Sequence, residues 1–353
     1  MSSRSFGDRV LGWGIDKGRR GLPWQIQRTP YRVWVSEIML QQTQVQTVIG
    51  YFQPFVARLP DVAALAAADF DEVMQLWSGL GYYARARNLH RAAKIVMAEH
   101  GGELPLHRES LQRLPGIGRS TAGAILALAT GQRQAILDGN VKRVLCRFHA
   151  IEGWPGQRQV ADSLWQLAEQ HTPEQGIAEY TQAIMDLGSM VCTRPRPRCE
   201  ACPLRADCRA LAQGRVGDYP WPRPRRLLPA RQTVFLMVRR SDGRVLLERR
   251  PPTGVWGGLW GFPECSPETD LEGWCLHRFG QSPRACSRLP VKRHSFSHYH
   301  LEILPILLEV DALPPSVMES DSVVWYQAGE SQIGGLPAPV AVLLQGLLSD
   351  SQS

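Results

Sequence analysis

Four cysteines within 17 residues constrain this chain more than any other feature of its sequence. The stretch CTRPRPRCEACPLRADC leaves six, two and five residues between Cys192, Cys199, Cys202 and Cys208. Thiolates this close together can surround one centre, and a set of four cysteines is typical of both zinc and [4Fe–4S] sites. The spacing alone does not separate the two. We therefore predict a metal-binding loop over residues 192–208.

The cellular compartment in which we expect this protein favours a metal site over disulfide bonds for these cysteines. The N-terminus lacks the apolar core of a secretory signal, and no stretch approaches the roughly 18 apolar residues that a membrane span needs. We expect a cytoplasmic protein that does not use a membrane and keeps its thiols reduced.

Charge is distributed unevenly along the chain. Residues 1–225 hold 28 basic and 20 acidic residues, whereas residues 226–353 hold 12 and 13. Excess positive charge is typical of proteins that bind a polyanion, although a solvated basic face would look the same. The first part of the chain therefore has the electrostatics of a polyanion binder, and the second part does not.

Periodicity also divides the chain. Residues 30–200 read as consecutive helices, beginning with YRVWVSEIMLQQTQVQTVIGYF, where Trp34, Ile38, Val45 and Val48 lie near helical spacing. DFDEVMQLW starts with a capping-box pattern at Asp69 and Glu72.

The composition of the chain changes at YPWPRPRRLLPAR, which is rich in proline and arginine. Such a stretch suits an extended linker, which we place over residues 219–231. Strand-like runs follow: TVFLMVRR, GRVLLERR, LEILPILLEV and SVVWY. We predict a mostly α domain over 1–218 and an α/β domain over 232–353.

A short turn precedes one of the apolar helices. In LPGIGRSTAG, Pro115, Gly116 and Gly118 form a turn that can present backbone N–H groups to an anion such as a phosphate. Ser120 follows the turn, in a place where a lysine would have offered an amine.

Together these motifs resemble the endonuclease III superfamily of helix-hairpin-helix DNA glycosylases. The cysteine spacing is similar to its iron–sulfur loop, residues 114–121 to its hairpin, and ILDGNVKRVL to the segment that carries its invariant aspartate. SEIMLQQTQV, LWSGLGYYARARNLH and RHSFSHYHL resemble the adenine DNA glycosylase (MutY) branch. This resemblance covers nearly the whole chain.

The resemblance implies a monomeric enzyme that excises adenine opposite 8-oxoguanine or guanine from double-stranded DNA, with a [4Fe–4S] cluster on the four cysteines. Strand-cleaving relatives form a Schiff base through the lysine that follows the hairpin. Ser120 has no amine for this step, which implies a monofunctional glycosylase. Lys142 is expected at the rim of the site. The cluster loop would contact phosphates through Arg194, Arg196 and Arg198.

Roles for individual residues follow from the same resemblance. Glu37 lies in an apolar stretch that favours a protonated carboxyl, and would protonate the departing adenine. Asp138 would stabilise the cationic sugar, and Asn140 would orient these groups by hydrogen bonds. Without the family, Glu37 reads as a surface glutamate and Asp138 as the N-cap of GNVKRVL, a role that is compatible with catalysis. The resemblance also implies that Gln42 and Tyr82 wedge into the DNA and that Gly116, Gly118 and Ser120 of the hairpin contact it.

The second domain resembles the Nudix fold in RPPTGVWGGLWGFP, but it lacks the glutamate-rich helix that binds magnesium in the hydrolases of that fold. The resemblance therefore implies that this domain recognises the oxidised guanine, through Phe296, Ser297 and His298.

Three other interpretations remain. They are an endonuclease III-like glycosylase and lyase acting on oxidised pyrimidines, a non-catalytic iron–sulfur DNA-binding protein, and a Nudix nucleotide hydrolase. Ser120 and the second domain argue against the first, Glu37 and Asp138 against the second, and the missing metal ligands against the third.

Overall fold

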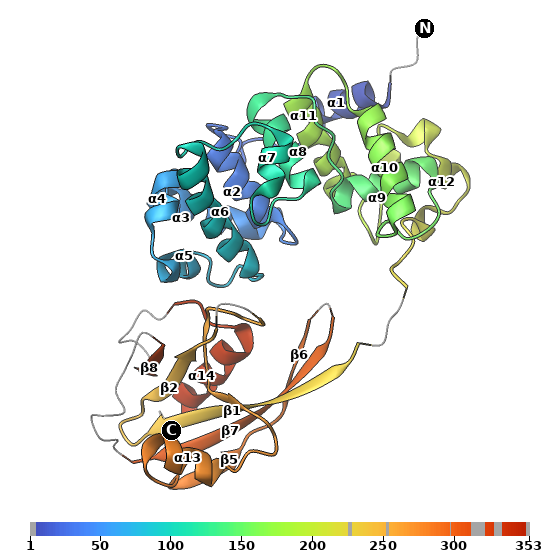
Figure 1. Cartoon of the computed structure of the whole chain (residues 1–353). Helices are drawn as coiled ribbons and strands as arrows, with labels where there is room; N and C mark the ends of the chain where they lie inside the picture. Colours follow the sequence, from blue (N-terminus) through green and yellow to red (C-terminus); the bar gives the residue numbers. More distant parts are fainter. Residues whose placement is uncertain are drawn as a thin grey trace. The chain divides into compact units, whose positions relative to one another are not determined.

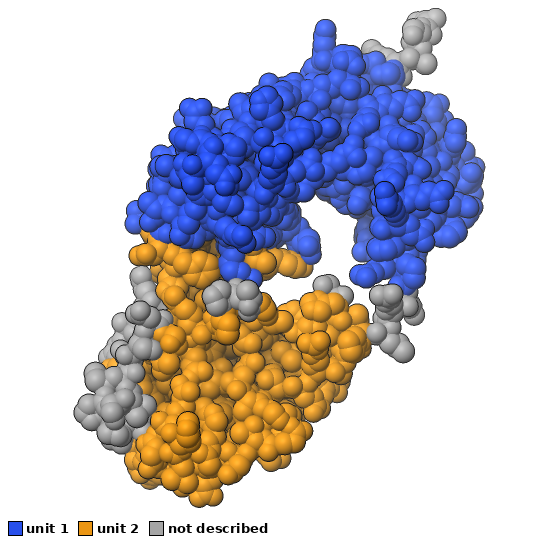
Figure 2. All heavy atoms as spheres, in the orientation of Figure 1, with its two compact units in different colours: residues 1–68, 85–225 blue, residues 69–84, 226–353 orange. Residues whose placement is uncertain are grey.

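The computed structural model describes residues 5–224, 228–251, 254–296, 298–311, 322–327 and 334–350. The chain forms two compact units, shown in different colours in Figure 2. The first contains Met1–Ala68 and Arg85–Arg225, and the second contains Asp69–Ala84 and Arg226–Ser353.

The first unit is helical (Figure 1). Its α-helices are α1 (Phe6–Lys17), α2 (Pro30–Leu40), α3 (Val45–Arg58), α4 (Val62–Ala67), α6 (Ala84–His100), α7 (Arg108–Arg113), α8 (Arg119–Thr130), α9 (Gly139–His149), α10 (Arg158–His171), α11 (Ile177–Asp186) and α12 (Arg209–Ala212). Short turns of other helix types follow at η1 (Leu187–Val191), η2 (Cys199–Ala201), η3 (Arg205–Asp207) and η4 (Val216–Asp218).

Helix α8 lies at the centre of this unit. Its residues from Ala122 to Leu128 are all buried, and it packs against both α2 and α11. Gly123 allows a close approach, because a Cβ there would lie 2.6 Å from the carbonyl oxygen of Ala135. The segment that leads to α9 can therefore lie directly against α8.

The long helical run expected from Tyr31 onward is interrupted. Helix α2 ends at Leu40, and α3 begins only at Val45. Between them Gln42 adopts φ +58°, the left-handed region, which cannot continue a right-handed helix. The capping box expected at Asp69 is not formed either: Asp69 precedes α5 (Phe70–Leu76), but its side chain makes no cap hydrogen bond.

The second unit is built on an eight-stranded sheet. Its strands are β1 (Ala230–Arg240), β2 (Val245–Arg249), β3 (Trp260–Gly261), β4 (Glu264–Cys265), β5 (Ala285–Arg288), β6 (Lys292–Ser295), β7 (His300–Val310) and β8 (Val323–Tyr326). The main path runs β3-β2-β1-β7-β5, and β1 pairs with β7 in parallel from Ala230↔His300 to Arg240↔Val310 (Figure 1). The expected strand-like runs all form strands.

Helices cover both faces of this sheet, which explains why β1 is apolar at consecutive positions. Val234, Leu236 and Val238 belong to a core with α13 (Leu271–Phe279). Phe235 and Met237 belong to another core, with α14 (Ala338–Asp350).

Residues 69–84 belong to the second unit although they lie far from its other residues in the sequence. Asp71 forms an ion pair with Arg249, and the Tyr83 hydroxyl donates to the carbonyl oxygen of Leu336 at 3.2 Å. Among the described residues, no helix combines the length and the apolar character that crossing a membrane requires.

A pair of histidines in the first unit links the ends of α9 and α10. Nε2 of His149 lies 2.8 Å from Nε2 of His171, whose ring stacks on Phe6 at 4.1 Å between centroids. Burial, with the charges of His149 and Arg9, lowers the pKa of His171 to about 4, and burial with the charge of Arg209 lowers the pKa of His149.

We predict that these histidines destabilise the fold as the pH falls. An unfolded histidine takes up its proton near pH 6.5, before the folded His171 does, so stability is lost between about pH 7 and pH 4. The variant His171→Phe keeps the stack on Phe6 and removes one of the titrating groups. Its denaturation midpoint should fall less between pH 7 and pH 5 than that of the wild type. An equal fall in both proteins would contradict the prediction.

Candidate functional site

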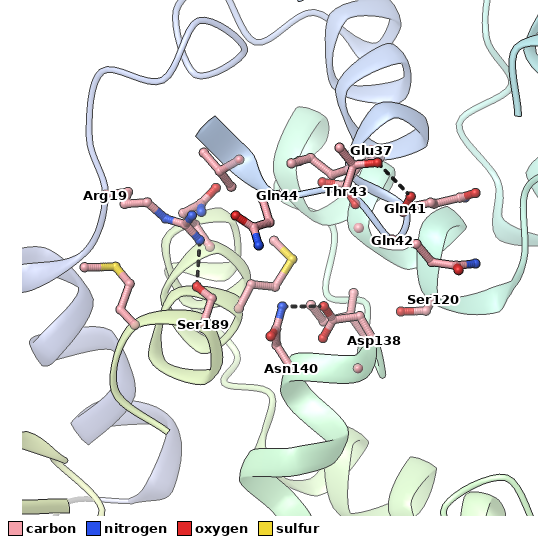
Figure 3. A pocket seen from close by; sticks show the side chains of 18 of the residues that line it. Arg19, Glu37, Gln41, Gln42, Thr43, Gln44, Ser120, Asp138, Asn140 and Ser189 are labelled. Carbon is pink, nitrogen blue, oxygen red and sulfur yellow. Dashed lines mark hydrogen bonds between the residues drawn. The ribbon is translucent and has the colours of Figure 1, made fainter. Parts of the chain in front are cut away.

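A cavity of about 850 Å³ opens in the first unit. It is lined from the loop after α1, the end of α2, the start of α8, the start of α9, and the α11–η1 region (Figure 3). Five residues of the expected site line it together: Glu37, Gln42, Ser120, Asp138 and Asn140. Lys142 is not among its lining residues.

Glu37 lies on α2, which begins with a well-formed cap. Thr29 accepts a hydrogen bond from the backbone N–H of Arg32, and Pro30 occupies the first turn. Its neighbours Ser36 and Ile38 are buried. Burial, with a smaller contribution from the charge of Asp138, raises the pKa of Glu37 to about 8. Its carboxyl group is therefore protonated at neutral pH and available as an acid.

Asp138 is the N-cap of α9, as the sequence predicts. Its Oδ1 accepts from the backbone N–H of Val141 at 2.8 Å, and its Oδ2 accepts from the side-chain amide of Asn140 at 3.0 Å. Burial raises the pKa of Asp138, while these hydrogen bonds act in the opposite direction because they stabilise the carboxylate. Two carboxyl groups in different environments thus face the same cavity.

Asn140 is held from its other side by Arg143. Nη2 of Arg143 donates to Oδ1 of Asn140 at 2.9 Å and to the carbonyl oxygen of Gly188 at 2.6 Å. The glycine is needed there, because a Cβ at position 188 would lie 2.6 Å from Cβ of Asn140. These contacts fix which end of the Asn140 amide points at Asp138.

Ser120 has a structural partner next to Asp138. Its Oγ accepts a hydrogen bond from the backbone N–H of Leu137 at 3.0 Å. The turn before it contains Gly116 at φ +83°, where a side chain would be strained, and Gly118 is the N-cap of α8. Ser120 at the start of α8 therefore supports the segment that carries Asp138, while Gly116 and Gly118 of the preceding turn remain exposed.

Arg19 lines the opposite wall of the cavity and pairs with a buried aspartate. Nε of Arg19 donates to Oδ1 of Asp186 at 2.8 Å, and Nη2 of Arg19 donates to Ser189 at 2.8 Å. The Asp186 side chain is fully buried and also accepts from Gln182 at 2.9 Å. Sequence reasoning missed Arg19, because its partner Asp186 lies 167 residues away. It also missed Gln182 and Arg143, although their partners Asp186 and Asn140 lie only four and three residues from them.

The four cysteines line one common cavity. The buried Arg147 of α9 holds its wall: Nη1 donates to Sγ of Cys192 at 3.3 Å and to the carbonyl oxygen of Thr193 at 2.7 Å. Sγ of Cys208 donates to the carbonyl oxygen of Arg147 at 3.5 Å. Burial, with smaller contributions from the other thiols of the group, raises the pKa of Cys202 to about 11.

Four thiols around one cavity form a donor set that suits a metal centre. Zinc requires its thiolates about 2.3 Å from one point. A [4Fe–4S] cluster instead spreads its four thiolates over four iron atoms, as four cysteines around a shared cavity would allow.

Other expected site residues lie in the second unit. Tyr82 is 57% exposed and has φ +51°. The Phe296 ring lies 6.1 Å from that of His298 and 5.3 Å from that of Trp256. Ser297 lies outside the described residues. Helix α13 carries a single glutamate, Glu272, where the sequence predicted no magnesium-binding run.

Known proteins resemble both parts of the chain. Residues 35–170 match the HhH-GPD superfamily of base excision DNA repair proteins, and residues 234–346 match the NUDIX domain. The adenine DNA glycosylase of Buchnera aphidicola subsp. Acyrthosiphon pisum is 36% identical over 345 residues, which cover 98% of each chain. The human adenine DNA glycosylase is 36% identical over 380 residues, covering 88% of this chain and 69% of the human one.

Solved structures agree with the first of these matches. A thermostable thymine-DNA glycosylase superposes with a TM-score of 0.54 and 26% identity, over 59% of this chain and 95% of its own. Endonuclease III in a complex with DNA has a TM-score of 0.51 at 22% identity, over 59% of this chain and 94% of its own, and shares the fold.

The pKa of Glu37 can be tested directly. We predict that its carboxyl carbon titrates near pH 8 in nuclear magnetic resonance spectra of the ¹³C-labelled protein. Asp138→Asn should lower that pKa, because it removes the negative charge that opposes ionisation, while leaving it above the usual range through burial. A titration near pH 4.5 in the wild type would show that Glu37 is hydrated and not an acid at neutral pH.

Proposed function

This chain belongs to the adenine DNA glycosylases, base excision repair hydrolases with an HhH-GPD domain, and we propose that it excises adenine paired with 8-oxoguanine or guanine. The observation that carries the proposal is the pair of carboxyl groups in one cavity. Glu37 has a pKa of about 8, and Asp138 is hydrogen-bonded as a carboxylate. Such a pair is what cleavage of a glycosidic bond requires.

Access to the bond requires that the nucleotide leave the helix. A base inside the stack cannot be reached, so the adenosine must rotate into the cavity. Gln42 and Tyr82 are the residues that we propose to fill the gap. The hairpin residues Gly116, Gly118 and Ser120 would contact the phosphates beside it.

The chemistry is then divided between the two carboxyl groups. Glu37 donates its proton to an imidazole-ring nitrogen of adenine as the bond to C1′ breaks and its electrons pass to the base. The Asp138 carboxylate stabilises the positive charge that develops on the sugar, with Asn140 keeping it in orientation. A water molecule adds to C1′ and gives up a proton to Glu37, which restores the acid.

The hydrolysis ends with an abasic site rather than a broken strand. Formation of a Schiff base requires an amine, and Ser120 offers a hydroxyl that already accepts from Leu137. We therefore assign the chain a monofunctional activity on DNA.

The central experiment uses a duplex that carries adenine opposite 8-oxoguanine. We expect free adenine and an abasic strand that breaks only after hot alkali, and no protein–DNA adduct after borohydride reduction. Strand breaks without alkali, together with an adduct, would favour a glycosylase and lyase. No release of adenine would favour a non-catalytic DNA-binding protein.

We predict that Glu37→Gln retains duplex binding and loses about 10²–10⁴-fold of the single-turnover rate, because the amide keeps the shape and removes the proton donor. The wild-type rate should decline as the pH rises through about 8, since the pKa of Glu37 is raised to that value and the acid is lost above it. A Glu37→Gln variant with a normal excision rate would show that another group is the acid.

We assign a [4Fe–4S] cluster to Cys192, Cys199, Cys202 and Cys208. When bound it would cross-link the loop that also carries Arg194, Arg196 and Arg198, which we propose to contact phosphates. Hydrolysis of an N-glycosidic bond transfers no electrons, so the contribution of these cysteines to excision is to position the loop.

We predict about four iron atoms per chain and a broad visible absorption band in anaerobically purified protein. Cys199→Ser should lose iron and DNA affinity, with a smaller effect on the chemical step of the protein that remains bound. Zinc in place of iron would contradict the assignment.

For the second unit we propose that Phe296, Ser297 and His298 read the oxidised guanine. We predict that His298→Ala lowers the preference for adenine opposite 8-oxoguanine over adenine opposite guanine by about tenfold, the value of one good contact to a base. His277→Ala, an exposed histidine on α13, is the matched control. The measurement is the ratio of single-turnover rates on the two duplexes at one salt concentration. An unchanged ratio in His298→Ala would remove His298 from this role.

A further inference from the structure

The loop 41–44, between α2 and α3, has a strained backbone next to the proposed active site. Gln42 adopts φ +58°, in the left-handed region, which is unfavourable for an L-amino acid with a side chain. Such a conformation persists only where the surroundings over-determine it, and it is found most often at functional sites. The question is which residues of the described chain hold this loop.

Arg85 of α6 holds one side of the loop. Its side chain is only 7% exposed. Nη1 donates to the carbonyl oxygens of Ile38 at 3.1 Å, Met39 at 2.6 Å and Gln41 at 2.5 Å. These carbonyl groups belong to the last turn of α2 and its C-cap, where Ile38 also accepts from a backbone N–H, that of Gln41 at 3.3 Å. A cation there is favoured by the helix dipole. Arg85 therefore ends α2 and fixes the direction in which the chain leaves it.

The side chain of Gln41 holds the other side. Its Nε2 donates to the carbonyl oxygen of Gly116 at 3.3 Å and lies 3.4 Å from Oγ1 of Thr121. Both partners belong to the hairpin and the helix that follows it. The loop of Gln42 is thus attached to the segment that we propose to bind phosphate.

Helix α6 also touches the hairpin itself. A Cβ on Gly116 would lie 3.0 Å from Cβ of Asn88, so the hairpin backbone packs against this residue. Asn88 lies one turn after Arg85, and residues three apart share a face of a helix. One face of α6 therefore sets the spacing between the hairpin and the loop 41–44.

From these contacts we propose that Arg85 and Gln41 are positioning residues for the insertion of Gln42 into DNA. They hold its strained backbone at a fixed distance from the hairpin before DNA binds. When the hairpin then binds the phosphates, the Gln42 side chain is placed at the base step. Figure 3 shows Gln41 and Gln42 leaving the loop beside Ser120, at the start of α8. The inference rests on the proposed function, because it assigns a means of extruding adenine.

The test compares two duplexes that differ in how firmly the adenine is held. In one the adenine is paired with 8-oxoguanine, and in the other it lies opposite a stable abasic analogue, where no partner base has to be displaced. Gln41→Leu should slow single-turnover excision from the paired duplex about tenfold, as expected for coupled neighbouring residues, and by no more than about twofold from the other. Arg85→Met should behave in the same way, with partial recovery in Arg85→Lys.

Two controls separate positioning from damage to the fold. Gln112→Leu on α7 and Arg91→Met on α6 replace exposed residues of the same types and should leave both rates unchanged. If Arg85→Met does not fold, Gln41→Leu and Arg85→Lys decide the question. Equal slowing on the two duplexes would overturn the inference, because a damaged cavity affects both alike.

A double-mutant cycle tests the link to Gln42 itself. If Gln41 acts through Gln42, the variant Gln41→Leu/Gln42→Ala should be no slower on the paired duplex than Gln42→Ala alone. Additive losses would show that Gln41 acts by another route. Normal rates in Gln42→Ala would overturn the inference but leave adenine excision by the wild type, and hence the proposed function, intact.

Discussion

The carboxylate of Asp138 caps helix α9, and the rest of the cavity is organised around that hydrogen bond. Because Oδ1 accepts from Val141, the carboxylate cannot rotate away from the cavity without leaving the start of α9 unpaired. Oδ2 then remains available to Asn140. A local structural requirement thus keeps a charged group where we propose that the reaction needs it.

Helix α9 also connects this carboxylate to the cysteine loop. Arg143, one turn along, reaches Asn140 and the carbonyl oxygen of Gly188, and its Nε donates to the carbonyl oxygen of Cys192 at 2.7 Å. Arg147, one turn further, is buried and donates to carbonyl groups on both sides of the loop, including those of Thr193 and Tyr219. A buried guanidinium is tolerated when such acceptors surround it. The end of α9 is therefore joined to the cysteine loop, while its beginning carries Asp138.

Hydrogen bonding distinguishes the two carboxyl groups of the cavity. Glu37 lies among apolar side chains of α2, so its neutral form is favoured, and the nearby negative charge of Asp138 adds to that preference. Asp138 is buried as well, but it has two donors directed at it. The same residue chemistry thus gives an acid and a carboxylate, and the difference between them is one of hydrogen bonding.

Much of this arrangement follows from short-range pattern. The strands of the second unit follow from their apolar runs, and the cap at Asp138 follows from an aspartate before a glycine and a helical stretch. The structure departs from the sequence pattern where a few residues override it. The helical spacing of apolar residues from Trp34 to Val48 continues through residues 41–44, yet the helix ends there because of Arg85 and the left-handed Gln42. The sequence pattern of a capping box is present at Asp69, but the Asp69 side chain forms no cap hydrogen bond.

The sequence by itself determined the helical and sheet-containing parts and the grouping of four cysteines, because each depends on residues near one another in the chain. The two carboxyl groups were singled out by the resemblance to a family and not by local pattern. Only the tertiary structure decided that Arg19 faces the cavity, since its partner Asp186 is 167 residues away. It also placed residues 69–84 with the second unit through Arg249 and Leu336. A spacing rule reports which side chains share a face of one element, but the pairing of buried charges depends on which elements pack together, and that is settled by the whole core.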